Sequence, residues 1–424
     1  MGAQLIRQKK PLRVCMVGTR GFPNVQGGVE KHCERLSVHL ARRNCAVTVL
    51  TRKPYVDTFI TSYGGVRLVP LPAVRQKNVE ALLHTFIGVL VAGIRMRPDV
   101  LHIHGIGPSL FAPLARALGL KVVLTSHGSN YHHLKWGLFG KLALRAGELM
   151  GVSFAHEVIA VSKIIGEQIQ QKYGRRPVVI PNGVDFGSCP GCDSLLQRFG
   201  LADAKFILSV GRLVPEKGFD ILVQSFLKSK LTGWKLAIAG AADHEDRYSA
   251  ALKKTGTMDS NVVFTGYLDE PSLRVLYGRC GLFVLPSYYE GMPIALLEAM
   301  AEGASCIASD LRANRLAELE ESRYFPPGNP DELAKKLKIY CGKRWEESEK
   351  KLQQARIREL HDWSAIADKT YQTYQGVAMG TLSRRLSESS SVADRGRSFS
   401  TASNLLTHSD PGPRVQGCNG ASGL

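Results

Sequence analysis

The sequence predicts two α/β domains of similar size, each built on a largely parallel β-sheet, followed by a disordered tail. Short apolar runs of strand length alternate with stretches of helical character through residues 13–162, and the same rhythm restarts at 206. The apolar runs are continuous, which is typical of strands that helices cover on both faces. From residue 378 the chain becomes rich in Ser and poor in large apolar groups, too poor to offset the entropy of ordering.

Length and composition are those of a globular protein. The chain has 424 residues, of which 44% are hydrophobic and 22% charged, and domains average roughly 150 residues. The longest apolar run, Ala81 to Ile94, contains His84 and is shorter than the roughly 20 residues of a membrane-spanning helix. The basic start leads straight into a strand-like run with no cleavage site, and the nine cysteines lie mostly in apolar runs. We therefore expect a cytoplasmic protein with reduced thiols.

The first domain is predicted to span residues 1–183, because the turn residues Pro181, Asn182 and Gly183 suit a linker. Its strands are expected at residues 13–18, 46–51, 66–71, 99–105, 121–128, 157–162 and 177–185, and its helices at 29–42, 79–95, 109–118 and 136–152.

The second domain is predicted to span residues 184–360. Its strands are expected at residues 206–213, 234–240, 261–268, 282–287 and 305–310, and its helices at 218–229, 293–302, 331–340 and 345–360. The aromatic and apolar residues Trp363, Ile366, Tyr371 and Tyr374 could then form the stripe of a last helix near 361–377 that completes the first domain. Residues 378–424 are the Ser-rich tail.

Positive charge is concentrated in the first half of the chain. The formal net charge is +18, and residues 1–185 hold 25 Lys and Arg against 9 Asp and Glu. A basic face of this kind serves nucleic acid, an anionic membrane or a phosphorylated substrate, or is only a solvated surface. No nucleic-acid-binding motif accompanies it, so we expect no nucleic-acid partner.

A glycine-rich loop follows the first strand and ends in Gly27-Gly28 at the start of a helix. Free amides and the helix dipole make such a terminus a phosphate site, although a tight strand-to-helix turn would also explain the two glycines. This loop lacks the G-x-G-x-x-G pattern, and the chain contains no P-loop motif. Dinucleotide and P-loop functions are therefore disfavoured.

Two cations follow the first strand of the second domain. Arg212 and Lys217 lie five residues apart in the loop after that strand, where α/β sheets bind ligands. They could grip a diphosphate, Arg as a planar fork and Lys as a point charge, or they could be two solvated side chains.

Two carboxylates give the most specific signal. Glu290 lies in the loop before Gly291, and Glu298 lies within the apolar helical run IALLEAMA. A carboxylate on such a helix needs a partner, because burying it unpaired is costly. A helix-terminal anion and a core ion pair are the structural alternatives.

Metal and redox signals are weaker. No D-x-D motif occurs, residues 243–246 suit a solvated loop, and Cys189 and Cys192 form a lone C-x-x-C. His102 and His104 share one face of a strand, and His132 and His133 are adjacent; surface placement is the simpler interpretation for both pairs. We expect no cofactor and no required metal.

On the E-x7-E spacing of Glu290 and Glu298, the sequence resembles the retaining glycosyltransferases of family 4. Gly27-Gly28, Ser126-His127-Gly128, VIAVS, IPNGVD, GRLVPEKG and FTG occur in the family's order over residues 13–375. The opening MVGTRGFPNVQGG and HIHGIGP are similar to bacterial members that extend cell-surface polysaccharides. The resemblance implies the GT-B fold, two facing Rossmann-like domains with the active site in the cleft between them.

The resemblance also implies roles for individual residues. Gly28 would meet a donor diphosphate, with Gly27 beside it, and Arg212 and Lys217 would neutralise its charge. Glu298 would bind the nucleotide ribose, Glu290 with Gly291 the transferred sugar, and His127 would face that sugar from the other domain. The same family pattern assigns the nucleobase to Thr265 and Gly266. One departure is Gly128, where the family commonly has Asp.

The expected activity is transfer of a sugar from a nucleotide-diphosphate donor to a glycan or lipid-linked acceptor with retained configuration, by an enzyme of hexosyltransferase type. The front-face route implied by the family has the leaving diphosphate oxygen accept the acceptor's proton. The alternatives are a nucleotide-sugar epimerase of the same fold, which needs no acceptor, and a non-catalytic nucleotide-sugar-binding protein. The basic half suggests peripheral docking at the inner face of the plasma membrane.

Overall fold

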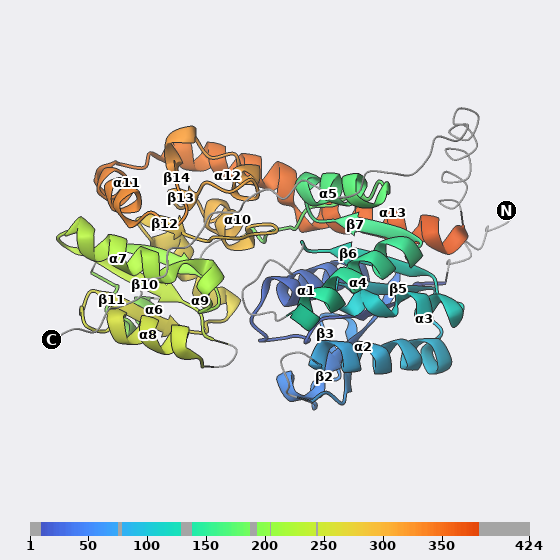
Figure 1. Cartoon of the computed structure of the whole chain (residues 1–424). Coiled ribbons are helices and arrows are strands. Elements are labelled where there is room, and N and C mark those ends of the chain that lie inside the picture. The colour runs from blue at the N-terminus through green and yellow to red at the C-terminus, as the bar shows by residue number, and fades with distance from the viewer. Residues whose placement is uncertain are drawn as a thin grey trace, which may run out of the picture. The chain divides into compact units, whose positions relative to one another are not determined.

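The structure is a computed structural model that describes residues 10–74, 79–128, 138–186, 193–203, 205–242 and 245–380. These residues form two parallel-sheet α/β domains, as predicted (Figure 1). The tail prediction for residues 378–424 concerns almost entirely residues outside the described ranges, as do Cys189 and Cys192. No helix among the described residues is both long and apolar enough to span a membrane.

The first sheet has eight strands in the order β3-β4-β2-β1-β5-β6-β7-β8, and all neighbours are parallel except β3 and β4. Its strands are β1 (Leu12–Val17), β2 (Cys45–Arg52), β3 (Ser62–Tyr63), β4 (Val66–Leu71), β5 (Val100–His104), β6 (Val122–Ser126), β7 (Glu157–Ala160) and β8 (Val178–Val179). The helices of this half are α1 (Gly28–Ala41), α2 (Glu80–Val91), α3 (Ala112–Ala117), α4 (Leu138–Phe154) and α5 (Lys163–Tyr173).

The second sheet has six strands in the order β11-β10-β9-β12-β13-β14, all parallel. Its strands are β9 (Lys205–Val210), β10 (Trp234–Ala239), β11 (Val262–Gly266), β12 (Leu282–Leu285), β13 (Cys306–Ser309) and β14 (Tyr324–Phe325). The helices that follow β8 are α6 (Asp193–Arg198), α7 (Phe219–Ser229), α8 (Arg247–Gly256), α9 (Glu270–Arg279), α10 (Ile294–Ala301), α11 (Pro330–Gly342), α12 (Glu347–His361) and α13 (Trp363–Met379).

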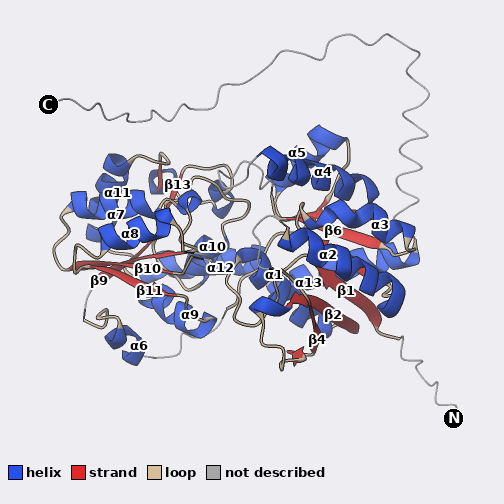
Figure 2. Ribbon diagram, turned by 60° about the horizontal axis from the view of Figure 1, so that its bottom comes forward, coloured by secondary structure: helices blue, strands red, loops and turns tan. Residues whose placement is uncertain are grey.

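Helices lie on both sides of the strands in each half (Figure 2). The central strands β5, β6 and β12 are therefore buried along their whole length. Polar residues at the carboxyl ends of these strands lie where ligands of open parallel sheets bind.

The last helix, α13, forms where the aromatic stripe predicts a helix, and it lies against the first domain. It packs on α1 and β5, and Val184 forms a bridge with Asp362 just before it. A Cβ on Gly183 would lie 2.4 Å from the Trp363 ring, so only glycine admits this indole. At the other end, the Tyr374 hydroxyl lies 2.6 Å from His102 Nδ1 in the buried core.

Several elements differ from the sequence prediction. The strand expected at 177–185 shrinks to Val178–Val179, because Pro181 and Asn182 lead the chain out of the sheet. The helix expected at 109–118 begins as a 3₁₀ turn over Pro108–Phe111. Helices α5, α6, α8 and α9 were not predicted; α8 and α9 are stabilised by Asp246 and Asp269 side chains that cap their first turns.

We predict that Tyr374→Phe lowers the free energy of unfolding by about 1–3 kcal/mol, because it leaves a buried imidazole nitrogen without its partner. Urea denaturation gives the value. Tyr371→Phe, on the same helix but only partly buried, is the matched control and should change stability far less. Equal effects of the two substitutions would contradict a stabilising Tyr374–His102 contact.

Candidate donor-binding site

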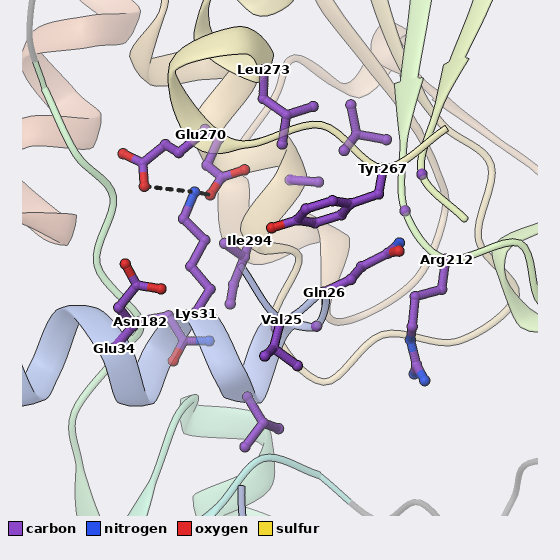
Figure 3. A pocket seen from close by; sticks show the side chains of 18 of the residues that line it. Val25, Gln26, Lys31, Glu34, Asn182, Arg212, Tyr267, Glu270, Leu273 and Ile294 are labelled. Atoms are coloured by element: carbon purple, nitrogen blue, oxygen red, sulfur yellow. Dashed lines mark ion pairs between the residues drawn. The ribbon is translucent and has the colours of Figure 1, made fainter. Parts of the chain in front are cut away.

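A cavity of about 780 Å³ is lined by residues from both domains, mostly from loops that follow the strands of the two sheets. It is large enough for a nucleotide. Figure 3 shows Lys31 extending from α1 toward Glu270, with Gln26, Arg212 and Tyr267 around the same space. The polar side chains that line the cavity include Gln26, Lys31, Glu34, Arg35, His127, Asn182, Arg212, Lys217, Tyr267, Asp269, Glu270, Arg274, Glu290 and Glu298.

The glycine-rich loop enters this cavity at the start of α1. Gly27 caps the helix at φ 148°, and a Cβ there would lie 2.0 Å from a Glu30 carboxylate oxygen. Gly28 follows as the first helical residue and also lines the cavity. Only glycine adopts this backbone without strain, so main-chain amides can approach a ligand here.

A buried ion pair holds the loop in shape. Arg20 Nε donates to Glu30 Oε1 at 3.0 Å, and the same guanidinium donates to the carbonyl of Gln26. Burial, the largest single effect, would raise the pKa of Glu30, but the charge and hydrogen bond of Arg20, a main-chain hydrogen bond and the charge of Arg212 together lower the pKa below its ordinary value. The Gln26 side chain then accepts from the main-chain amide of Ala241, in the loop after β10, at 3.2 Å.

The two predicted cations lie in the loop after β9. Arg212 and Lys217 both line the cavity, and Lys217 ends the 3₁₀ turn Pro215–Lys217. Lys217 Nζ lies 2.6 Å from Glu290 Oε1, and the Ser287 hydroxyl donates to the same oxygen at 2.6 Å. A cation and a carboxylate from two loops are therefore already positioned together at the cavity wall.

The buried partner that Glu298 requires comes from the other domain. Glu298 Oε1 forms an ion pair with Lys31 of α1, while Oε2 accepts from the Tyr277 hydroxyl at 2.9 Å. Lys31 Nζ also lies 3.8 Å from Glu270 Oε2. The neighbouring α1 residue Arg35 pairs with Asp185 at 2.9 Å and with Glu270.

His127 comes directly after β6 and lines the cavity. A Cβ on Gly291 would lie 2.2 Å from the His127 carbonyl oxygen, so the loop carrying Glu290 passes against the His127 main chain. Gly128, where the family commonly has Asp, has φ 113° and lies close to Tyr289. Residues from both domains thus meet at this point.

His102 and His104 are buried rather than at the surface, which corrects the simpler interpretation of the sequence. His102 Nε2 lies 2.6 Å from the Thr125 hydroxyl, and His104 Nδ1 lies 3.4 Å from His127 Nε2. Burial lowers the pKa of His102, His104 and His127 well below the ordinary value and that of His32 to about 4. These imidazoles are therefore neutral at pH 7. His132 and His133 lie outside the described residues.

Of the predicted site residues, the structure places Gly27, Gly28, His127, Arg212, Lys217, Glu290, Gly291 and Glu298 around the cavity. Thr265 and Gly266 do not line it, and the next residue, Tyr267, does. The Thr265 hydroxyl instead donates to the carbonyl of Gly266 at 3.0 Å. The cavity lining along this loop therefore begins at Tyr267, the residue after the predicted pair.

Sequence reasoning missed Lys31, His32, Asn182 and Tyr267. Lys31 and Arg35 are four residues apart on α1 and so share a face, which could have indicated a basic stripe behind the glycines. Asn182 lies within IPNGVD, interpreted only as a linker. Its side-chain oxygen lies 2.7 Å from His32 Nδ1, a pairing of residues 150 apart in sequence.

Comparisons with known proteins agree with this architecture. A family model described as Glycosyltransferase Family 4 matches residues 26–187, and one described as Glycosyl transferases group 1 matches residues 196–358. The chain is 27% identical to the phosphatidyl-myo-inositol mannosyltransferase of Mycolicibacterium smegmatis, over 87% of this chain and 94% of that one. It is 32% identical to TuaC of Bacillus subtilis, whose name assigns it to teichuronic acid biosynthesis, over 50% and 54%.

Solved structures show the same fold. Sucrose-phosphate synthase from Thermosynechococcus elongatus aligns with a TM-score of 0.72 at 21% identity, covering 87% of this chain and all of that one. Anabaena HepE in complex with UDP-glucose aligns with a TM-score of 0.70 at 20% identity, covering 86% and 100%. The fold is that of a two-domain GT-B glycosyltransferase. The chain belongs to the family-4 glycosyltransferases.

We predict that Glu30→Gln lowers the free energy of unfolding at pH 7 by about 1.5–3 kcal/mol, because a charge-assisted bond to Arg20 is weakened. Since the folded-state pKa of Glu30 is lowered, this stabilisation exists above the unfolded pKa and disappears as the pH falls through the folded pKa. The difference in unfolding free energy between the wild type and Glu30→Gln should therefore shrink below about pH 4.5.

Urea denaturation of the wild type and of Glu30→Gln from pH 7 to pH 3.5 measures this difference in unfolding free energy. The control is Glu332→Gln, which removes the exposed partner of Lys335 and should change stability by less than about 1 kcal/mol. A Glu30→Gln difference that stays constant over this pH range would show that Arg20 does not lower the pKa.

Proposed function

We propose that this glycosyltransferase transfers a hexosyl group from a nucleotide-diphosphate sugar to a glycan or lipid-linked acceptor with retention of anomeric configuration. The observation that carries the proposal is that Arg212, Lys217 and Glu290 of one domain line the same cavity as Gly28 and His127 of the other. Cations, free amides and a carboxylate at one place match the phosphates and hydroxyls of a nucleotide sugar.

Each group has a role in binding the donor. Amides at Gly27 and Gly28, with Arg212 and Lys217, would bind the diphosphate. Glu298, once Lys31 releases it, would accept hydrogen bonds from the ribose hydroxyls. Tyr267, half exposed at the cavity, would stack on the base, next to Thr265 and Gly266, whose main-chain atoms the resemblance places beside that base.

Glu290, with Gly291, would hold the hydroxyls of the transferred sugar, and His127 would contact that sugar from the other side. UDP-glucose in the complex of Anabaena HepE is a donor of this class. This complex of a protein with the same fold supports a nucleotide-sugar partner.

We propose a front-face mechanism for the transfer. The bond between the sugar and the diphosphate lengthens first, and negative charge develops on the leaving oxygen. That oxygen accepts the proton of the acceptor hydroxyl, which attacks the same face. Fixed cations directed at the developing charge supply the main stabilisation, so Arg212 and Lys217 act in catalysis as well as in binding. We propose that no metal ion and no cofactor is required, because these cations can neutralise the diphosphate.

Two other activities remain distinguishable by experiment. A nucleotide-sugar epimerase of this fold would convert its donor with no acceptor present. A non-catalytic nucleotide-sugar-binding protein would bind the donor tightly and turn nothing over. Transfer that depends on an added acceptor separates the first proposal from both.

The names of the relatives support surface polysaccharide or lipid-linked acceptors. TuaC is named for teichuronic acid, and the mycobacterial relatives are named for a phosphatidylinositol. We propose that the protein works in polysaccharide biosynthesis, peripherally attached to the inner face of the plasma membrane.

The described residues offer one docking face for that membrane. On α4, Leu142 and Leu149 are 63% and 43% exposed, and Arg145 lies between them on the same side of the helix. The α4 helix packs on α3, which contacts α2, where Phe86 is 40% exposed. Lys135 and Trp136, which precede α4 in the sequence, lie outside the described residues, as do Arg75 and Lys77, which precede α2.

We predict that Lys217→Ala lowers kcat/KM at least tenfold, because one charge-assisted contact to the diphosphate is worth about 1.5–3 kcal/mol. A panel of nucleotide sugars, screened by thermal stabilisation, first identifies the donor; at 100 times its dissociation constant it adds about 2.7 kcal/mol. Lys228→Ala, which removes an exposed ion pair with Asp331, is the control and should leave kcat/KM unchanged. Lys217→Ala kinetics equal to the wild type would exclude the diphosphate role.

We predict that the protein sediments with phosphatidylserine vesicles and that added salt releases it, since exposed charges are screened within about 8 Å at physiological ionic strength. Lys141→Ala with Arg145→Ala should weaken binding roughly 10- to 30-fold, at about 1 kcal/mol per cation. Lys335→Ala with Lys336→Ala, on α11 of the other domain, is the matched control. Equal recovery with neutral and anionic vesicles at low salt would favour a soluble acceptor.

A further inference from the structure

Three histidines meet behind the donor cavity, at a place that the proposed transfer does not explain. His32 of α1, His104 at the end of β5 and His127 after β6 each offer a ring nitrogen, and these atoms lie within 4.8 Å of one another. The ring of His32 meets the rings of His104 and His127 edge to face, with centroids 5.5 and 4.8 Å away. This is the spacing of groups that could share one ion.

The separation of two of these nitrogens already suits a metal. His104 Nδ1 and His127 Nε2 are 3.4 Å apart, which is long for a hydrogen bond. It matches the edge of a zinc tetrahedron, about 3.3–3.4 Å for Zn–N distances of about 2.0–2.1 Å. A turn of the His127 ring, which is only partly buried, can shorten the longest separation.

The surroundings of His32 are those of a metal ligand. Its Nδ1 lies 2.7 Å from the side-chain oxygen of Asn182 and donates to it, so the lone pair lies on Nε2. That Nε2 is buried and makes no hydrogen bond, and His32 is only 3% exposed. His361 Nδ1 fixes Asn182 in turn by donating to its carbonyl oxygen at 2.8 Å. A second hydrogen bond that fixes the tautomer is the usual support of a ligating histidine.

A second unpartnered nitrogen lies in the same cluster. His104 Nε2 is also buried without a hydrogen bond, and His104 is 1% exposed. Two buried imidazole nitrogens without partners are unfavourable in a protein interior. Binding of a cation by His32 Nε2 would relieve this cost at His32, whereas His104, which faces His127 through Nδ1, would keep its Nε2–H without a partner.

We propose that His32, His104 and His127 form a binding site for a divalent transition-metal ion of the zinc type. Neutral imidazoles are the ligand form, and three of them with an open fourth position suit Zn²⁺ better than Mg²⁺ or Ca²⁺, which prefer oxygen ligands. The ion enters through the donor cavity, because His127 lines it.

Occupancy of this site inhibits the transferase. A metal-bound His127 is held toward His32 and His104 and no longer contacts the donor sugar. This consequence rests on the proposed function, whereas metal binding itself does not. Zinc should therefore compete with the donor, and a chelator should restore turnover.

Zinc binding to the full-length chain, purified without a histidine tag, tests the site directly. The protein carries Cys189→Ser and Cys192→Ser, so that the C-x-x-C pair cannot supply a second zinc site. We expect one zinc per chain, and Co²⁺ in its place should give the strong visible absorption of a tetrahedral site. His32→Asn and His104→Asn should each weaken zinc binding at least tenfold. His39→Asn, also on α1 but outside the cluster, is the control and should bind as the parent does.

Zinc-edge anomalous diffraction from crystals of the unsubstituted chain decides the case if a histidine variant does not fold. A peak between the three imidazoles supports the proposal. A peak elsewhere, or no saturable binding by the parent protein, overturns it. If one zinc ion binds at the cluster but does not compete with the donor, the metal site stands and the proposed inhibition of transfer is wrong.

Discussion

The pairing of cations with carboxylates across the cavity is the interaction on which the site depends. Lys31 of the first domain is held by Glu298 and Glu270 of the second, and Lys217 is held by Glu290. Each charge is largely removed from water, so none can be buried without its partner. A donor must replace these contacts with its own phosphates and hydroxyls. The Lys31 pairs join the two domains, and together with the Lys217–Glu290 pair within the second domain they define what can bind in the cavity.

The histidines follow from the same geometry. Parallel strands β5 and β6 end side by side, and their carboxyl ends carry His104 and His127 to the place where α1 contributes His32. Beneath these three histidines, the Tyr374 hydroxyl of α13 forms a hydrogen bond with the buried His102. The hydrogen bonds of this polar interior couple the last helix to the strand that positions the site, although the two are more than 250 residues apart in the chain.

The repeated alternation of apolar strands and helices was sufficient to predict two parallel-sheet domains, because strands buried on both faces need helices between them. The glycine turn before α1, the loop cations and the E-x7-E pair were also readable from local chemistry. Weakly amphipathic helices such as α9 were not, since their stability comes from capping and tertiary packing. The omission of α9 also hid Glu270, the second partner of Lys31.

The sequence by itself determined the fold class, the apolar stripe of a last helix that includes Trp363 and Tyr374, and which polar residues lie at strand ends. Only the tertiary structure decided which of these residues meet. The partner of Glu298 is Lys31, on a helix of the other domain, and the partner of His32 is Asn182, 150 residues away. Periodicity and turn chemistry act over a few residues along the chain. Contacts between the two sheets depend on how whole domains pack, which no local pattern specifies.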